Sequence, residues 1–218
     1  EDMASAFDRI CSGAPAGWLV EEFLDHCRSI NLHYLITGPG QFKLLGISEQ
    51  ILREFLYSGN QGLEFRDADP AIASCLSQCA TIARDISLTG YTGLIGPDFI
   101  LSPDGRSFAI ENNIRINGST FSLSWVAEWE QALQTDLSWR FEKVRAPGEL
   151  SFSQIVELLE DCLLVPGERN EQGTFIQEYN VHNGVTEIAI TTVAPEVAVL
   201  EKIRSTIIHR LDPQKGSV

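Results

Sequence analysis

The pattern that most restricts the fold lies in residues 93–119, where two mainly apolar stretches flank Asp104-Gly105. Asp-Gly between alternating apolar residues is a strong signal for a two-residue hairpin loop, because both residues tolerate a positive φ. If they form the centre of the turn, the pairing places Asp98 directly opposite Glu111. Side chains alternate between the faces of a strand, so this register predicts one wholly apolar face, made of Phe99, Leu101, Phe108 and Ile110.

The other face of the predicted hairpin carries Asp98 and Glu111 as a directly opposed pair. Such pairs have Cβ atoms about 4.5–5.5 Å apart, and like charges at that distance destabilise a sheet. The repulsion is relieved when one carboxyl is protonated or a cation lies between them. Two interpretations follow. One is a solvated turn in an acidic protein, and the other is a site for Mg²⁺, which takes oxygen ligands from one or two carboxylates and from phosphates.

The residues after Glu111 add groups that suit a metal and a phosphate. Asn113 and Arg115 fall on the same face if the strand continues, so Asn113 offers an amide oxygen and Arg115 a bidentate group for phosphate. Residues 117–120 read Asn-Gly-Ser-Thr. They offer N–H groups and hydroxyls where a helix is predicted to begin, a position that binds anions. The pattern favours the metal–phosphate site over the solvated turn.

The rest of the chain predicts an α+β protein of antiparallel hairpins backed by helices. Apolar alternation bounded by turn residues predicts strands at 18–24, 29–36, 41–52, 173–181 and 185–193. Apolar residues at helical spacing predict helices at 69–90, 122–133, 152–164 and 195–211. Residues 53–70 and 134–150 are predicted to be irregular. We place a boundary near residue 145, which gives one domain over residues 1–145 and a small C-terminal α+β domain over residues 146–218.

Composition narrows the class of partner. The 218 residues suffice for one large domain or two small ones, and the net charge of −14 disfavours nucleic acid and anionic membranes. No apolar run approaches the roughly 18 residues of a membrane helix, and no secretory leader is visible. The five cysteines form no CxxC pair and no zinc spacing, which is typical of reduced thiols in a cytoplasmic protein. The chain opens at Glu1 and has a single methionine, so we expect it to be a fragment of a longer protein.

Some chemically suggestive residues have plain structural interpretations. His33 alternates with Asn31 on a predicted strand and could approach a nucleotide, but a packed or surface histidine is the stronger expectation. The pairs expected to form core stripes on helices are Cys75 with Cys79 and Trp125 with Trp129.

An acid followed, after a hairpin, by Glu-x-Asn-x-Arg and a glycine resembles the magnesium-binding segment of the ATP-grasp ligases. Here the pattern reads Asp98, Glu111, Asn113, Arg115 and Gly118. Upstream, WLVEEFLD resembles the strand-to-hinge segment of that superfamily, whose backbone grips the adenine edge. The resemblance covers roughly residues 1–133, and SINLHYLI and SEQIL are most similar to the pheganomycin-type peptide ligase group.

The resemblance implies an ATP-grasp-like fold of antiparallel sheets and helices, with ATP and Mg²⁺ as cofactors. It implies that Asp98, Glu111 and Asn113 hold the metal and that Arg115 is catalytic. The residues that it assigns to the adenine pocket are Glu21, Glu22, Phe23 and Leu24. Those that it assigns to the acyl substrate are Asn117, Gly118 and Ser119.

The implied reaction is an ATP-dependent carboxylate–amine ligation of the peptide type. A carboxylate attacks the γ-phosphate of ATP to give an acylphosphate and ADP, and an amine then displaces phosphate. The small-molecule partners are therefore a carboxylate and an amine. Residues 146–218 would form a cap that could shape the acceptor pocket.

The sequence departs from the family pattern in two respects. Ser29 stands where an acid often holds the ribose, and the phosphate-binding lysines and glycine-rich loop would have to lie upstream of Glu1. The upstream N-terminal part of the same ligase is therefore an expected partner. Two alternatives remain: an ATP-grasp enzyme with another acceptor, as in a kinase-like or carboxylation reaction, and a non-catalytic remnant that binds a nucleotide or a partner.

Overall fold

The computed structural model describes residues 5, 8, 22–25, 27–53, 56–63, 69–165 and 168–212. Its strands are β1 (Arg28–Gly38), β2 (Gln41–Arg53), β3 (Leu56–Gly62), β4 (Gly93–Leu101), β5 (Ser107–Asn113), β6 (Ser138–Pro147), β7 (Gly173–His182) and β8 (Val185–Ala194). Its helices are α2 (Pro70–Leu88), α3 (Thr120–Leu133), α4 (Phe152–Leu159), the 3₁₀ turn η1 (Glu160–Cys162) and α5 (Val197–Leu211).

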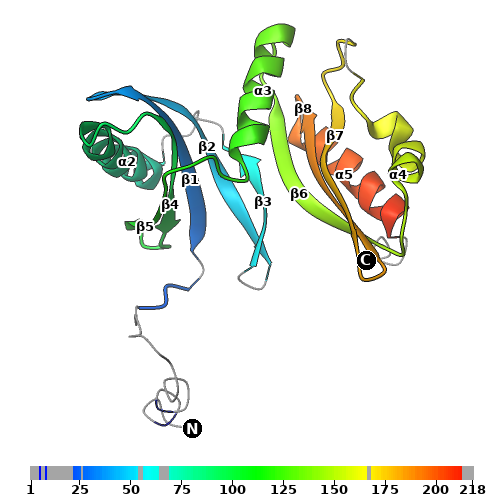
Figure 1. Cartoon of the computed structure of the whole chain (residues 1–218), viewed down its shortest axis with the longest axis horizontal. Coiled ribbons are helices and arrows are strands. Elements are labelled where there is room, and N and C mark those ends of the chain that lie inside the picture. Colours follow the sequence, from blue (N-terminus) through cyan, green and yellow to red (C-terminus); the bar gives the residue numbers. More distant parts are fainter. Residues whose placement is uncertain are drawn as a thin grey trace.

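The strands form one eight-stranded sheet in the order β5-β4-β1-β2-β3-β6-β8-β7. Every neighbouring pair is antiparallel, which confirms the α+β class. Figure 1 shows α2 against the β1–β4 part of the sheet, α4 and α5 against the β6–β8 part, and α3 between the two parts. Among the described residues, no helix is long and apolar enough to cross a membrane.

Alternate residues of β1 divide the two faces of the sheet. Ile30, Leu32 and Ile36 belong to a buried apolar cluster with residues of α2. Asn31 and His33 face the other way, and His33 lies within hydrogen-bonding distance of Ser119 and Thr120 at the start of α3. The apolar face is therefore covered by α2, which leaves the polar face of β1 for the groups discussed below.

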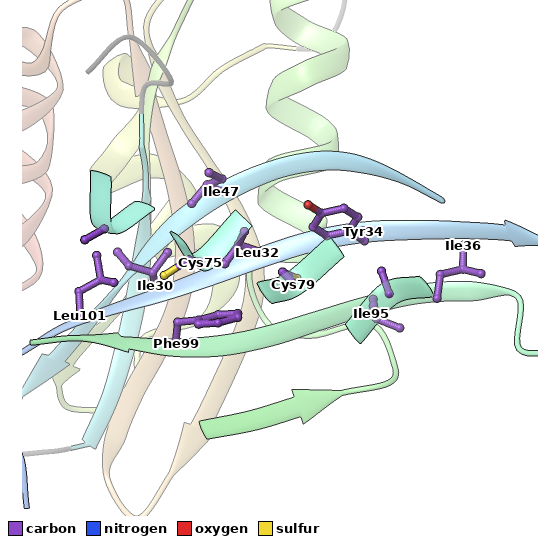
Figure 2. Close-up of a cluster of buried hydrophobic side chains, with 12 residues drawn as sticks. Ile30, Leu32, Tyr34, Ile36, Ile47, Cys75, Cys79, Ile95, Phe99 and Leu101 are labelled. Carbon is purple, nitrogen blue, oxygen red and sulfur yellow. The ribbon is translucent and has the colours of Figure 1, made fainter. Parts of the chain in front are cut away.

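Helix α2 begins as its sequence predicts. The Asp69 side chain accepts a hydrogen bond from the Ala71 N–H, and Pro70 occupies the first turn, where its missing N–H costs nothing. Figure 2 shows side chains of β1 and β4 gathered around Cys75 and Cys79 of α2, which are fully buried. The core role predicted for these two cysteines is confirmed.

Two predictions of irregular structure are wrong, because β3 lies within residues 53–70 and β6 within residues 134–150. The sequence of β3, LYSGNQG, is rich in glycine, which normally argues against a strand. Here the glycines permit the close approach of β6, the neighbouring strand in the sheet. A Cβ at Gly59 would lie 2.0 Å from the Phe141 carbonyl oxygen, and one at Gly62 would lie 2.4 Å from Nε1 of Trp139.

The strand predicted at 18–24 falls mostly outside the described residues, and residues 22–24 are not in a strand. The predicted helix 152–164 is shorter, because α4 ends at Leu159 and continues as η1. The hairpin of β7 and β8 is confirmed: Asn183 and Gly184 form its turn, with φ of 51° and 73°.

The boundary predicted near residue 145 falls within β6, which pairs with β3 on one side and β8 on the other. The sheet is therefore continuous there, and the division into residues 1–145 and 146–218 stays a prediction.

Buried Glu142 of β6 also connects elements on either side of this boundary. Its carboxylate accepts a hydrogen bond of 2.8 Å from Nη2 of Arg204 on α5 and lies 3.6 Å from Nη2 of Arg53 on β2.

We expect Phe99→Ala to lower the free energy of unfolding by about 3–5 kcal/mol. Phe99 is fully buried, and its removal leaves a cavity that the surrounding side chains fill only in part. Phe152→Ala is the matched control, because Phe152 is about half exposed. It should cost about 1 kcal/mol or less, mainly its edge contact with Tyr179. Urea unfolding of the three proteins checks this. Equal losses for both variants would contradict the assigned core.

Candidate functional site

The hairpin of β4 and β5 pairs Asp98 with Glu111, as the sequence predicts. Between Phe99 and the turn the predicted register is wrong, because Phe99 pairs with Ala109 and a bulge separates this pair from that of Asp98 and Glu111. The Ser102 N–H donates to the Arg106 carbonyl, so the loop contains three residues, and Gly105 takes a φ of 85°. A three-residue loop with glycine in the left-handed region is a common hairpin alternative.

The bulge moves Ile110 off the apolar face. Ile110 is 56% exposed and lines a cleft together with Asp98 and Glu111. The predicted apolar face thus keeps Phe99 and Leu101, which are buried, and loses Ile110. It also loses Phe108, which pairs with Ile100 and therefore lies on the opposite face. The extra residue restores the opposition of the two acids that the shorter loop had predicted.

Asp98 is 6% exposed and is held by two amides. Nδ2 of Asn31 donates to Oδ1 of Asp98, and Nδ2 of Asn113 donates to Oδ2 over 3.1 Å. The pKa of Asp98 is raised to about 6, mainly by burial; the hydrogen bond from Asn31 opposes this shift, and the charge of Glu111 acts in the same direction as burial. A buried carboxylate beside a second acid is a site where a cation is stabilised.

Asn31 connects this carboxylate to the start of α3, and the sequence did not single it out as a site residue. Its Oδ1 accepts hydrogen bonds from Nδ2 of Asn117 over 3.0 Å and from Oγ of Ser119 over 3.3 Å. Gly96 permits this contact, since a Cβ there would lie 2.2 Å from Nδ2 of Asn117. The signal available in the sequence was position: a polar residue alternating with apolar ones on a buried strand.

His33 continues the same polar row. It is 1% exposed, and its Nε2 lies 3.2 Å from Oγ of Ser119 and 3.4 Å from Oγ of Ser48. Burial lowers its pKa to about 4, so the ring is neutral at pH 7. The expectation of a packed histidine is confirmed. Trp125 and Trp129 likewise stack, with ring centroids 4.8 Å apart, against the cluster of Leu123 and Trp139.

A cleft of about 800 Å³ brings most of the predicted residues together. Glu22 does not line it, and Glu21 lies outside the described residues. The sequence-predicted residues that line it are Phe23, Leu24, Asp98, Glu111, Asn113, Arg115, Asn117, Gly118 and Ser119. Residues that line it and were not predicted include Asn31, Gln50, Tyr57 and Asn60.

The donor set fits a hard divalent cation. Among the described residues there is no cluster of three His, Cys, Asp or Glu side chains, as a metal held entirely by protein would need. Mg²⁺ needs fewer, because it keeps waters and shares substrate phosphates. Asp98, Glu111 and the amide oxygen of Asn113 supply oxygen ligands of the required kind, and Arg115 is exposed at the same cleft.

Comparison with known proteins places the fold. No family model matches the sequence, and no curated protein sequence matches it significantly. Solved structures do match. The biotin carboxylase domain of a single-chain bacterial carboxylase has a TM-score of 0.59 at 13% identity, over 94% of this chain and 51% of that one.

Two further structures agree with this match. N5-carboxyaminoimidazole ribonucleotide synthetase from Thermus thermophilus has a TM-score of 0.60 at 12% identity, over 97% of this chain and 58% of that one. L-amino acid ligase from Bacillus licheniformis has a TM-score of 0.57 at 14% identity, over 88% of this chain and 55% of that one.

The fold of this chain is that of the ATP-grasp proteins. The chain spans about half the length of the structures it matches, and identities of this size establish the fold alone.

We expect the pH dependence of stability to expose the buried carboxyl. The pKa of Asp98 is raised from 3.8 to about 6 on folding, so its contribution is full below about pH 4 and is lost as pH rises through about 6. The metal-free chain should lose about 1–2 kcal/mol of unfolding free energy over that interval, allowing for solvent screening. Asp98→Asn should flatten the loss, as urea unfolding from pH 4 to pH 7 would show.

Asp104→Asn serves as the control, because hydrogen bonds from Ser102 and Arg106 lower the pKa of Asp104 to about 2, the opposite direction. This variant should keep the loss of stability between pH 4 and pH 7. An unchanged profile in Asp98→Asn would contradict the burial assigned to Asp98.

Proposed function

We propose that this chain is the metal- and acyl-binding part of an ATP-dependent carboxylate–amine ligase that acts through an acylphosphate. The observation that carries the proposal is the opposition of Asp98 and Glu111 at a cleft that Asn113 and Arg115 also line. Such a pair is unfavourable without a cation and suits a Mg²⁺-bound nucleotide. The ATP-grasp fold of the chain supports the same reaction class.

Each residue then has a defined task. Asp98, Glu111 and Asn113 would hold Mg²⁺, which when bound neutralises the charge of the β- and γ-phosphates. Asn31 and Asn113 fix the orientation of the Asp98 carboxylate. Arg115 would steady the transferring phosphoryl group, where a planar guanidinium suits three oxygens.

The nucleotide and the acyl group would occupy different ends of the cleft. Phe23, Leu24 and Ile110 offer apolar surface for the adenine, at the end of the cleft formed by the residues before β1. Glu21 and Glu22 belong to the same proposed hinge. Asn117, Gly118 and Ser119 would contact the acyl substrate at the start of α3, where N–H groups favour anions.

The chemistry needs no nucleophile from the protein. The substrate carboxylate forms a bond to the γ-phosphorus as the bond to ADP breaks. The amine then forms a bond to the acyl carbon as phosphate leaves, and its proton is lost. The protein therefore contributes position and charge.

We place this protein in the cytoplasm, with small-molecule partners and with residues 146–218 as a C-terminal cap. The phosphate-binding lysines would come from an N-terminal part of the same ligase. A second candidate, carboxylation, is favoured by the match to a biotin carboxylase domain. It predicts ADP release that depends on bicarbonate in place of an added carboxylate.

Glu111→Gln should reduce ADP release about 100-fold or more, because it removes one of the two metal carboxylates while keeping the shape of the side chain. The measurement uses the complete polypeptide that contains residues 1–218, supplied with ATP, Mg²⁺, carboxylates and amines. Glu157→Gln is the control, since Glu157 is exposed on α4, away from the cleft. Undiminished turnover in Glu111→Gln would contradict the assignment of Glu111 as a metal ligand.

A further inference from the structure

A second cavity, of about 460 Å³, adjoins the cleft at the start of α3. Tyr57, Asn117 and Gly118 line both hollows, so one wall separates them. The remaining lining comes from α3, β6 and β7, and none of it belongs to the metal hairpin. A ligand in this second cavity would therefore reach the cleft past residues 117 and 118.

Two opposite charges flank the floor of this cavity. Lys143 of β6 and Glu178 of β7 both pair with Ala189 of the intervening β8. The three residues thus form one row across the sheet, and strands lie about 4.7–4.9 Å apart. The backbones of Lys143 and Glu178 are therefore separated by roughly 10 Å, with a small methyl group between them. This spacing leaves room for a ligand that carries both a negative and a positive group.

The order of the strands orients such a ligand. β3 lies beside β6, whereas β7 lies two strands further away. Tyr57 is two residues from Gly59, whose partner on β6 is Glu142, the neighbour of Lys143. The ammonium group of Lys143 thus lies next to the wall shared by the two cavities, and the carboxylate of Glu178 lies at the far side. A bound zwitterion would direct its carboxylate towards the metal cleft.

The charges are available to a ligand. Glu187 already pairs with Arg145, with Nε and Oε2 2.7 Å apart, and Nζ of Lys143 lies 3.8 Å from the other oxygen. Lys143 can therefore turn to a ligand while Glu187 stays paired. Glu178 makes no ion pair with another residue in the part of the chain that the structure describes.

The other walls favour an apolar side chain. Phe121 of α3 is 56% exposed, and Phe141 lies on β6. Gln177 is fixed, because its Nε2 donates to Oγ of Ser122 over 2.7 Å and to Oγ1 of Thr191 over 2.5 Å. The cavity thus combines a rigid polar edge, the rings of two phenylalanines and of Tyr57, and one charge of each sign.

We propose that this cavity binds the carboxylate substrate and that this substrate is a free amino acid with an apolar side chain. Lys143 holds its carboxylate at the wall shared with the metal cleft, and Glu178 holds its ammonium group. This inference rests on the proposed function, in which a carboxylate is activated at the cleft. It adds that the acid to be activated carries a positive charge.

The test compares L-leucine with 4-methylpentanoate, which differs by the absence of the amino group. Binding to the 218-residue chain is measured by NMR titration without nucleotide or metal. We expect L-leucine to bind about tenfold more tightly, because a charge-assisted contact is worth at least that factor. Glu178→Gln should remove the difference between the two ligands, and Lys143→Met should weaken both about tenfold.

Arg84→Met is the control, because Arg84 is exposed on α2, where it pairs with Asp85, and does not line the cavity. It should bind both ligands as the wild type does, and thermal melting should show that all variants fold. Equal binding of the two ligands by the wild type, no detectable binding of L-leucine, or an unchanged preference in Glu178→Gln would overturn the proposal.

Failure of this inference is distinguishable from failure of the proposed function. Glu111→Gln leaves the second cavity intact, so it should bind L-leucine normally even where ADP release is lost. Normal ADP release that depends on Glu111, without selectivity for the amino group, would remove the amino acid assignment alone.

Discussion

The hydrogen bond between Asn31 and Asp98 is the interaction on which the site depends. A buried carboxylate is costly unless donors satisfy it, and here Asn31 and Asn113 do so from two neighbouring strands. The same Asn31 amide accepts hydrogen bonds from Asn117 and Ser119, so it fixes the start of α3 relative to the metal hairpin. One side chain thereby sets the orientation of the metal carboxylate and of the turn proposed to bind the substrate.

The sheet makes this possible because its two faces are built differently. Helix α2 closes one face of the β1–β4 part with an apolar cluster. The opposite face carries a polar row from Ser29 through Asn31 to His33, all at most 8% exposed. Buried polar groups are tolerated when they are bonded to one another, and the row is closed by Ser48, Ser119 and Thr120. The two hollows lie on this polar side, beside the N-terminus of α3.

Much of the fold followed from local patterns. The apolar period of residues 69–90 predicted α2, and the structure confirms this helix. The Asp69 cap and the Asn183-Gly184 turn are short-range features of the same kind, and the structure contains both. Strand β3 could not be predicted in that way, because its glycines are needed for the close approach of β6, which is distant in sequence. The loop of the metal hairpin shows the same limit. Asp104-Gly105 suits loops of two or three residues, and packing decides between them.

The sequence by itself determined the chemistry of the site: two acids, an amide and an arginine at spacings that place them at one hairpin. The opposition of Asp98 and Glu111 was predicted from the shorter loop, and it holds in the structure because a bulge offsets the longer loop. The tertiary structure alone decided that Asn31 holds Asp98 and that Lys143 and Glu178 flank one cavity. The physical reason is distance along the chain: these contacts join strands far apart in sequence, and no local pattern encodes which strands become neighbours.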